Sequence, residues 1–369
     1  MRVRAYKLRT SGPSDISGLV DLFDTKQIRA EDVICIIGKT EGNGGRNDFT
    51  RDLAMTVFED LFSRLLKISR EEVTERIIFS LSGGTEGVVS PHIVVFAREG
   101  SESFEAASEK RLALGIGFTR EFAPGEIGRL AQVEETARVI SDVVRSLKVD
   151  SPSDIHFVQM KGAIPSYTWE EGEAARLSGN PMRSDMIYSR GASALGAAVA
   201  LGEVAIEELS DDSICSDWSK YSRTASCSAK PGLTRTEIMV MGNSRYWQGD
   251  LVINGGILKD MIDADSVRSV LGGLGAGMEV AGQASAEQTA RLVGIFGKSE
   301  ADPRGEIRGQ RHTMLTDDDI SDTRYSRCVL ASVVASVVGD TAIYISTRSE
   351  HHGPLGGGTL ALIARVDEV

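Results

Sequence analysis

Three residue types capable of acid–base and nucleophilic chemistry recur in the same order along the chain. Each occurrence has a lysine at the end of an apolar run, an arginine on a segment with helical spacing, and a serine at the end of a second apolar run. The three sets are Lys39, Arg51 and Ser82; Lys161, Arg190 and Ser226; and Lys298, Arg327 and Ser346. A single residue of this kind is usually a surface or turn residue, so it is the threefold recurrence that favours a functional site.

If the three sets converge, their lysines and serines could act together as general bases and nucleophiles. Burial and nearby like charge both lower the pKa of a lysine, and a neutral lysine can act as a general base toward a serine hydroxyl. Arginines supply fixed donors for carbonyl or anionic oxygens. Such a centre suits a small, planar, oxygen-rich ring. In the second set Ser228, with Lys230 close by, competes with Ser226 as nucleophile, and Ser226 aligns better with the serines of the other sets.

The spacing within the sets supports three repeats of one structural unit. The second and third sets both have 29 residues from lysine to arginine, and the first has 12. A single β-α-β-type unit would leave one face of its sheet exposed, so three units should pack around a shared centre. We therefore predict an α/β fold of three homologous repeat units around a pseudo-threefold axis, with units at 1–103, 110–245 and 250–369. The acidic, serine-rich segment 99–110 is the predicted first linker.

The predicted elements place each residue type at the end of a strand or on a helix. Within each unit we expect the order strand, loop, helix, strand ending in lysine, arginine-bearing helix, strand ending in serine, and final strand. Residues 1–9 alternate as a strand does. Residues 124–147 form an amphipathic pattern with Pro124 near the start of a helix. The small residues of 189–204 predict a helix packed closely against a sheet or another helix.

The composition limits the classes of function. A net charge of −12 argues against a nucleic-acid surface or an anionic membrane as partner. The four cysteines are far apart and form no CxxC pair, which is typical of a reducing compartment. The N-terminal segment lacks the apolar core of a signal peptide, and the longest apolar stretch, 328–338, is too short to span a bilayer. We expect a cytoplasmic protein that acts on a small molecule without an organic cofactor.

A glycine-rich turn near the C-terminus, SEHHGPLGGG at 349–358, offers main-chain oxygens. With a carboxylate from Glu300, these oxygens would form the ligand set of a hard divalent cation such as Mg²⁺ or Ca²⁺. His351 and His352 raise zinc as an alternative, but no third histidine or cysteine lies near them with metal-site spacing. A glycine-rich active-site turn without a metal fits the same pattern.

Several segments resemble the cyanuric acid hydrolase/barbiturase family of cyclic amidohydrolases. They include GKTEGNGGRNDFTR, SGGTEGVVSPH, YSRGASALG, RGQRHTML and EHHGPLGGG, and they extend from about residue 16 to the C-terminus. The resemblance implies three similar units around a pseudo-threefold axis, with the active site on that axis. It also implies hydrolysis of one amide bond in a cyclic ureide.

The resemblance implies a role for each member of the three sets. The second unit carries the nucleophile Ser226 and its base Lys161. In the other two units, two lysine–serine pairs hold and polarise the substrate carbonyls: Lys39 with Ser82, and Lys298 with Ser346. The substrate-binding arginines are Arg51, Arg190 and Arg327. The arginines stabilise the oxyanion together with main-chain N–H groups beside the serines, at Gly83, Cys227 and Thr347. A structural cation is implied at Glu300 and at oxygens of Ser349, His352, Gly353, Pro354 and Gly357.

The reaction implied is ring opening of cyanuric acid to a carboxylated biuret, because segments 189–192 and 311–315 are more similar to the cyanuric acid branch of the family. Barbituric acid or another cyclic imide is the alternative substrate. Non-catalytic binding of a small planar metabolite is the alternative function. We also expect a homo-oligomer, with a tetramer as the favoured assembly.

The local sequence gives a separate reason to choose Lys161 as the base. Glu41 follows Lys39 by two residues and Glu300 follows Lys298 by two residues, and a neighbouring acid favours the charged form of a lysine. Lys161 is followed by glycine and lacks such a neighbour in sequence. Its proton should therefore be the easiest of the three to lose.

Overall fold

Each third of the chain builds one four-stranded mixed sheet, and the three sheets share one strand order. The computed structural model describes residues 1–45, 47–101, 105–275 and 277–366. The first sheet has the order β1 (Arg2–Arg9), β4 (His92–Glu99), β2 (Val33–Thr40) and β3 (Ile78–Gly83). The second has the order β5 (Arg111–Phe118), β8 (Glu237–Ser244), β6 (Ile155–Ile164) and β7 (Ala225–Pro231). The third has the order β9 (Leu251–Leu258), β14 (Gly358–Arg365), β10 (Leu292–Ser299) and β13 (Tyr344–Thr347).

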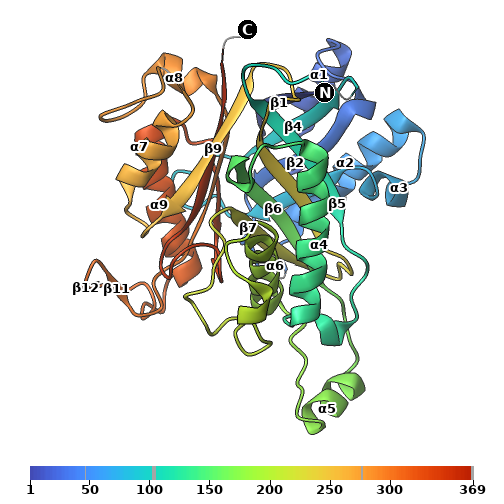
Figure 1. Cartoon of the computed structure of the whole chain (residues 1–369), viewed down its shortest axis with the longest axis vertical. Coiled ribbons are helices and arrows are strands. Elements are labelled where there is room, and N and C mark those ends of the chain that lie inside the picture. The colour runs from blue at the N-terminus through green and yellow to red at the C-terminus, as the bar shows by residue number, and fades with distance from the viewer. Residues whose placement is uncertain (46, 102–104, 276, 367–369) are drawn as a thin grey trace.

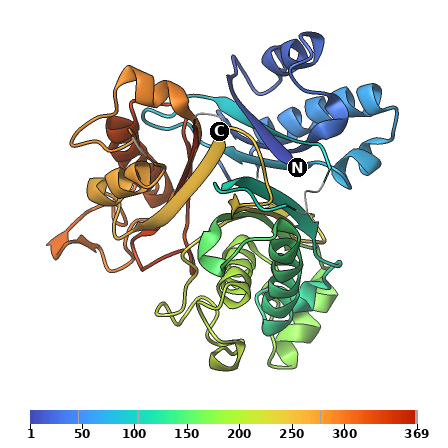
Figure 2. The same ribbon diagram turned by 45° about the horizontal axis from the view of Figure 1, so that its top comes forward.

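Strand direction is also the same in the three sheets. The first three strands of each order are antiparallel, and the last two are parallel: β2 with β3, β6 with β7, and β10 with β13. The lysine strands are therefore flanked on one side by a parallel serine strand and on the other by the final strand of the unit. Figure 2 shows three lobes around a common centre, coloured blue, green and orange to red. The predicted threefold repeat is confirmed.

Helices cover the outer face of each sheet, and one further helix, α5 (Trp169–Leu177), projects away from the sheets (Figure 1). The first unit has α1 (Ser17–Asp24), α2 (Phe49–Leu66) and α3 (Arg70–Thr74). The second has α4 (Leu130–Leu147), α5 (Trp169–Leu177) and α6 (Met186–Ala200). The third has α7 (Ala264–Gly272), α8 (Ala286–Arg291) and α9 (Asp322–Val338), with a small hairpin of β11 (Glu306–Ile307) and β12 (Gln310–Arg311). Short 3-10 turns lie at Ala30–Asp32, Pro124–Glu126, Pro152–Asp154 and Ile206–Glu208.

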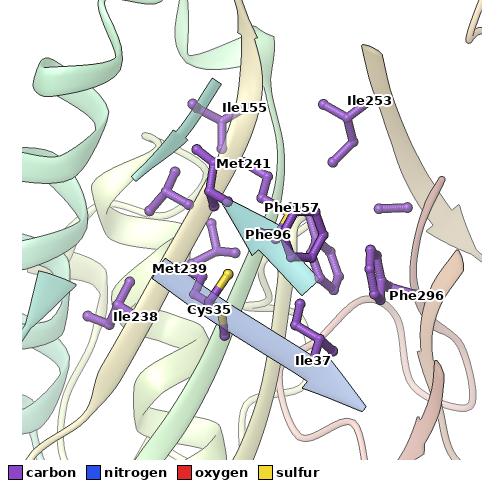
Figure 3. Packing of buried hydrophobic residues seen from close by; sticks show 14 of the residues in the cluster. Cys35, Ile37, Phe96, Ile155, Phe157, Ile238, Met239, Met241, Ile253 and Phe296 are labelled. Atoms are coloured by element: carbon purple, nitrogen blue, oxygen red, sulfur yellow. The ribbon is translucent and has the colours of Figure 1, made fainter. Parts of the chain in front are cut away.

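The inner faces of the three sheets bury one shared core (Figure 3). Phe157 of the second unit stacks on Phe296 of the third, with ring centroids 5.4 Å apart. Phe96 of the first unit lies 6.4 Å from the same ring. All three rings are fully buried. Each unit thus covers the sheet face that another unit would leave in water, which is the physical reason for the threefold assembly.

The small residues of α6 allow close helix packing, as predicted. Residues from Ser189 to Ala198 are buried, and a Cβ placed on Gly196 would lie 2.7 Å from the side chain of Thr136 on α4. The predicted helix start at Pro124 is wrong, because Pro124 opens a separate 3-10 turn and α4 begins at Leu130. Gly128 between them has φ +70°, a left-handed conformation that ends the first turn.

Each sheet takes its strands from one of the three predicted ranges, and the range boundaries themselves stay predictions. The proposed linker 99–110 includes residues 102–104, which lie outside the described residues. Within the part of the chain that the structure describes, no helix has the length and apolar character needed to cross a membrane.

Candidate active site

A cavity of about 610 Å³ lies where the three units meet. Its lining includes one serine from each unit, Ser82, Ser228 and Ser346. It also includes the three arginines predicted from the sequence, Arg51, Arg190 and Arg327. Gly83 and Thr347, which follow two of the serines, line it as well. The structure therefore gathers serine and arginine side chains from distant parts of the sequence around one space.

The sheet register places each lysine beside one serine. Lys39 on β2 pairs with Ser82 on β3, and Lys298 on β10 pairs with Ser346 on β13. Paired residues on adjacent strands project from the same face of the sheet. Lys161 on β6 pairs with Ser228 on β7. The strand pairing in all three units therefore holds a lysine and a serine side by side.

The predicted alignment of Ser226 with Ser82 and Ser346 is wrong. Ser226 pairs with Gln159, two residues before Lys161, and it is not part of the cavity lining. Both Ser226 and Ser228 project from the same face of β7, because side chains alternate along a strand with a period of two. Residue type alone therefore cannot separate them. The pattern Ser-x-Ser-small residue, which occurs as SLSG at 80–83 and SCSA at 226–229, is a sequence signal that supports Ser228.

The three lysines also join neighbouring units. Lys39 Nζ donates to Ser82 Oγ at 3.3 Å and to the main-chain oxygen of Ile345 at 2.9 Å. Lys161 Nζ donates to the main-chain oxygen of Leu81. Ile345 and Leu81 directly precede the cavity serines of the third and first units. These two lysines thus fix the serine strand of an adjacent unit.

Lys298 has contacts within its own unit instead. Its Nζ donates to Ser346 Oγ at 3.5 Å and to the main-chain oxygen of Thr347 at 3.4 Å. Ser346 and Thr347 are nearly buried, at 6% and 7% exposed. The Lys298 side chain is itself fully buried, and its contacts hold it within the third unit.

All three lysines are held in conditions that favour the neutral amine. Burial, followed by the charge of Arg51 and then of Lys230, lowers the pKa of Lys161 to about 7. Burial and Arg190 lower the pKa of Lys298 to about 7. Burial, and then the charge of Arg327, lowers the pKa of Lys39 well below its usual value. All three lysines share this downward shift, so the prediction that Lys161 loses its proton most easily, made from its lack of an acid in sequence, stays a prediction.

Each cavity arginine is oriented by a carboxylate. Arg190 on α6 donates from Nε and Nη2 to Glu350 at 2.8 and 2.7 Å, and both side chains are 6% exposed. Arg327 on α9 pairs with Glu86 of the first unit. These two ion pairs cross from one unit to the next. Arg51 Nε lies 3.6 Å from Asp48 of its own unit. The carboxylates fix how each guanidinium enters the cavity and take up part of its donor capacity.

Sequence reasoning missed these carboxylates. A signal for two of them exists, because Glu86 and Glu350 each follow a cavity serine by four residues, in SGGTE and STRSE. The second unit has Gly232 at the matching position after Ser228. The absence of an acid there explains why Arg51 is paired within its own unit.

The main-chain N–H of Cys227, predicted to stabilise an oxyanion, has another partner. It donates to Nε2 of the buried His352 at 2.9 Å. Burial, and then the charge of Lys298, lowers the pKa of His352 well below its usual value, which keeps the ring neutral and able to accept this bond. The prediction for Cys227 is therefore wrong. Ala229, which follows Ser228 and lines the cavity, takes the position in the second unit that Gly83 and Thr347 take in the others.

The C-terminal turn folds over Glu300, as the predicted cation site requires. Glu300 accepts a bond from Ser349 N at 3.3 Å, and the turn closes with Gly357 N donating to the oxygen of Pro354 at 2.9 Å. Gly353 within the turn has φ +102°. Burial, and then the neighbouring Glu350, raises the pKa of Glu300 to about 6. A half-buried carboxylate bonded to a glycine-rich turn, whose main-chain oxygens are further hard donors, has the donor chemistry of a hard-cation site.

The two histidines of the turn accept hydrogen bonds from main-chain N–H groups. His351 Nε2 accepts from Cys215 N at 2.8 Å, and its ring stacks on Trp218 with centroids 5.2 Å apart. In the described ranges there is no cluster of three or more His, Cys, Asp or Glu residues suited to a metal ion. The zinc alternative therefore has no support from the described side chains.

Comparisons with known proteins agree on one family. The family model described as "amidohydrolase ring-opening protein" matches residues 4–365. The chain is 47% identical to a cyanuric acid amidohydrolase of Enterobacter cloacae, over 99% of this chain and 100% of that protein. It is 43% identical to a cyanuric acid amidohydrolase of Pseudomonas sp. (strain ADP), over 98% of this chain and 99% of that protein.

Solved structures extend the likeness to the fold. One cyanuric acid hydrolase superposes with a TM-score of 0.89 at 42% identity, and 99% of each chain is covered. The cyanuric acid hydrolase of A. caulinodans superposes with a TM-score of 0.86 at 38% identity, again over 99% of each chain. With three matching sheets, a shared central cavity and full-length similarity, the chain belongs to the family of ring-opening amidohydrolases.

Proposed function

We propose that this enzyme opens the ring of cyanuric acid by hydrolysing one of its C–N bonds, giving carboxybiuret. The observation that carries the proposal is the convergence of Ser82, Ser228 and Ser346, each beside a buried lysine, with three arginines around one cavity. Cyanuric acid is a planar ring with three equivalent carbonyl groups, so it matches a site built from three similar units. Relatives named cyanuric acid amidohydrolase at 47% and 43% identity support this choice.

The reacting pair in this proposal is Ser228 with Lys161. Ser228 Oγ attacks a ring carbonyl carbon while its proton passes to Lys161 Nζ, and the negative charge moves to the carbonyl oxygen. The C–N bond then breaks, and the ring nitrogen takes the proton from Lys161. Water attacks the resulting acyl group with Lys161 again as the base, which releases the product and restores Ser228. The lysine is the one that the family resemblance implies, and the pairing of Lys161 with Ser228 supports our choice of Ser228 rather than Ser226 as the nucleophile.

The other two pairs would hold the carbonyls that do not react. Ser82 and Ser346 lie 3.3 and 3.5 Å from their lysines and can donate to a substrate oxygen. The arginines, oriented by their carboxylates, supply charged donors at the cavity wall, where such donors can stabilise an oxyanion. The main-chain N–H groups of Gly83, Ala229 and Thr347 are further candidates for that role.

Ring opening of barbituric acid is the alternative within this chemistry, and binding without catalysis is the alternative outside it. A panel of cyanuric acid, barbituric acid and other cyclic imides, followed by detection of the carboxylated product, separates the three. We expect fastest turnover with cyanuric acid. Faster turnover with barbituric acid would change the substrate, and binding of any panel member without product would refute the enzyme mechanism.

We further propose that the turn around Glu300 holds Mg²⁺ or Ca²⁺ as a structural cation. Main-chain oxygens of Ser349, His352, Gly353, Pro354 and Gly357 are its expected partners. A bound cation would offset the charge of the buried Glu300 carboxylate and brace the segment that carries Glu350. Cytoplasmic location and homo-oligomeric assembly stay predictions.

A further inference from the structure

The final strand of each unit places a different residue beside the lysine. His92 on β4 pairs with Lys39, and Glu237 on β8 pairs with Lys161. In the third unit Leu360 pairs with Gly297, so Thr359 comes beside Lys298. Directly opposed residues in an antiparallel pair project from the same face. Lys161 therefore has Ser228 on one side and a carboxyl group on the other, an arrangement that neither of the other lysines has.

The residues beside the other two lysines, His92 and Thr359, are neutral, and each is hydrogen-bonded to a main-chain oxygen. Burial lowers the pKa of His92 to about 4, and its Nδ1 lies 2.8 Å from the oxygen of Ser90. Thr359 Oγ1 donates to the oxygen of Ala225 at 2.8 Å. Carboxylates do act on these lysines from further away: Glu86 and Asp48 act on Lys39, and Glu350 and Glu300 act on Lys298. Glu86, Asp48 and Glu350 each lie beside an arginine, and Glu300 accepts a bond from Ser349 N.

Glu237, in contrast, is not paired with an arginine. Among the ion pairs formed by the described residues, none includes Glu237. The carboxyl is partly buried at the start of β8, between Lys161 on β6 and Phe118 on β5. Burial raises its pKa to about 7, and Lys230 and then Lys161 act against that rise. The carboxyl therefore interacts with the lysine ammonium through space rather than through a hydrogen bond.

We propose that Glu237 is a positioning residue for the reaction and that it makes Lys161, among three similar lysines, the base. This inference rests on the proposed function. When Ser228 attacks, its proton moves to Lys161, and the new ammonium is stabilised by the nearby Glu237 carboxylate. The proton then leaves Lys161 for the ring nitrogen, and Glu237 returns to its starting state without gaining or losing a proton. In the other units the residue beside the lysine on the final strand is a histidine or a threonine, so their ammonium forms lack this cross-strand stabilisation.

Other charged groups around the pair set the strength of this effect. Arg51 on α2 and Lys230 on β7 both lower the pKa of Lys161. Arg235, just before β8, favours the carboxylate form of Glu237, and Glu59 on α2 opposes it. Burial raises the pKa of the Cys227 thiol, so it stays neutral. A carboxylate at Glu237 is thus the main group that counters the positive charges around Lys161.

The test compares Glu237→Gln with Glu237→Asp in cyanuric acid turnover across pH. Loss of the carboxylate in Glu237→Gln should lower kcat by about 10- to 100-fold, with KM within about threefold of wild type. The pKa of Lys161 should fall without its counter-charge, so the acidic limb of the kcat/KM profile should move to lower pH. Glu237→Asp keeps the charge, so it should recover most of kcat and leave the limb near its wild-type position. Circular dichroism and the thermal midpoint establish that each variant is folded.

Glu59→Gln is the matched control, because it removes a carboxylate from the same neighbourhood on α2. It should change kcat by less than about threefold. An unshifted acidic limb in Glu237→Gln, whether or not kcat falls, would overturn the proposal, since a purely structural role predicts that result. Equal losses in Glu59→Gln and Glu237→Gln would also overturn it. Failure of the proposed function is a separate result, seen as no turnover of cyanuric acid by the wild-type enzyme.

Discussion

The ion pair between Arg190 and Glu350 joins the second and third units, and we predict that its removal weakens the whole assembly. Both side chains are 6% exposed, and the two N–O distances are 2.8 and 2.7 Å. In Glu350→Ala the Arg190 guanidinium stays buried without its counter-ion. Two charge-assisted hydrogen bonds of about 1.5–3 kcal/mol each are lost, and breaking a buried pair from one side typically costs about 3–5 kcal/mol. We expect a loss of about 4 kcal/mol in the free energy of unfolding.

Thermal unfolding followed by circular dichroism measures this loss. A change of 1 kcal/mol lowers Tm by about 2–4 °C in a domain of 150–250 residues and by less in a longer chain, so a fall of at least about 5 °C is expected. The double variant Arg190→Met with Glu350→Leu should recover much of the stability, because an apolar pair of similar volume avoids the unpaired charge.

The pair Arg29 with Asp32 provides the control, since the Arg29 side chain is 73% exposed and stays in water when Asp32, itself 13% exposed, is changed. Asp32→Asn should cost at most about 1 kcal/mol. If Glu350→Ala unfolds at the same temperature as Asp32→Asn, the Arg190–Glu350 pair does not brace the two units.

Three further predictions concern the cavity and its surroundings. His352→Gln should keep activity, because its amide oxygen can accept the hydrogen bond from the Cys227 N–H. His352→Leu cannot accept this bond, so it should lose about 1–3 kcal/mol of stability and have a lower kcat. Equal behaviour of the two variants would contradict the role of this bond. Glu300→Gln should lower Tm and abolish any effect of a chelator on Tm, and an unchanged response to chelator would exclude the proposed cation site. With the Lys161 pKa lowered to about 7, the neutral base forms as pH rises, so kcat/KM should increase through about pH 7; activity highest at acidic pH would show that another group is the base.

The repeated fold could be predicted because its signals are local. Each lysine and serine ends an apolar run, each arginine lies on a helix, and the spacing of 29 residues occurs twice. The run of small residues in α6 also predicted, from local sequence alone, a closely packed helix. What the sequence did not reveal was strand register. Whether Ser226 or Ser228 stands beside Lys161 depends on how β6 and β7 pair, and a shift of two residues keeps every side chain on the same face.

The electrostatic partners were also beyond the reach of local sequence. Glu237 lies 76 positions after Lys161, and the two meet through the antiparallel pairing of β6 with β8. Glu86 and Glu350 belong to different units from the arginines that they orient. Reasoning from residues adjacent to Lys161 therefore missed the acid that faces it. Burial also lowers the pKa of all three lysines, and it is the largest cause in each, ahead of the charges of neighbouring residues.

Trapping the acyl-enzyme tests the central claim most directly. Wild-type enzyme is mixed with cyanuric acid, quenched with acid, digested, and fragmented by mass spectrometry so that the modified serine is identified within segment 225–231. The acyl group should be found on Ser228; it should remain there in Ser226→Ala and be absent in Ser228→Ala. An acyl group on Ser226, Ser82 or Ser346 would contradict the assignment of Ser228 and Lys161 as the reacting pair.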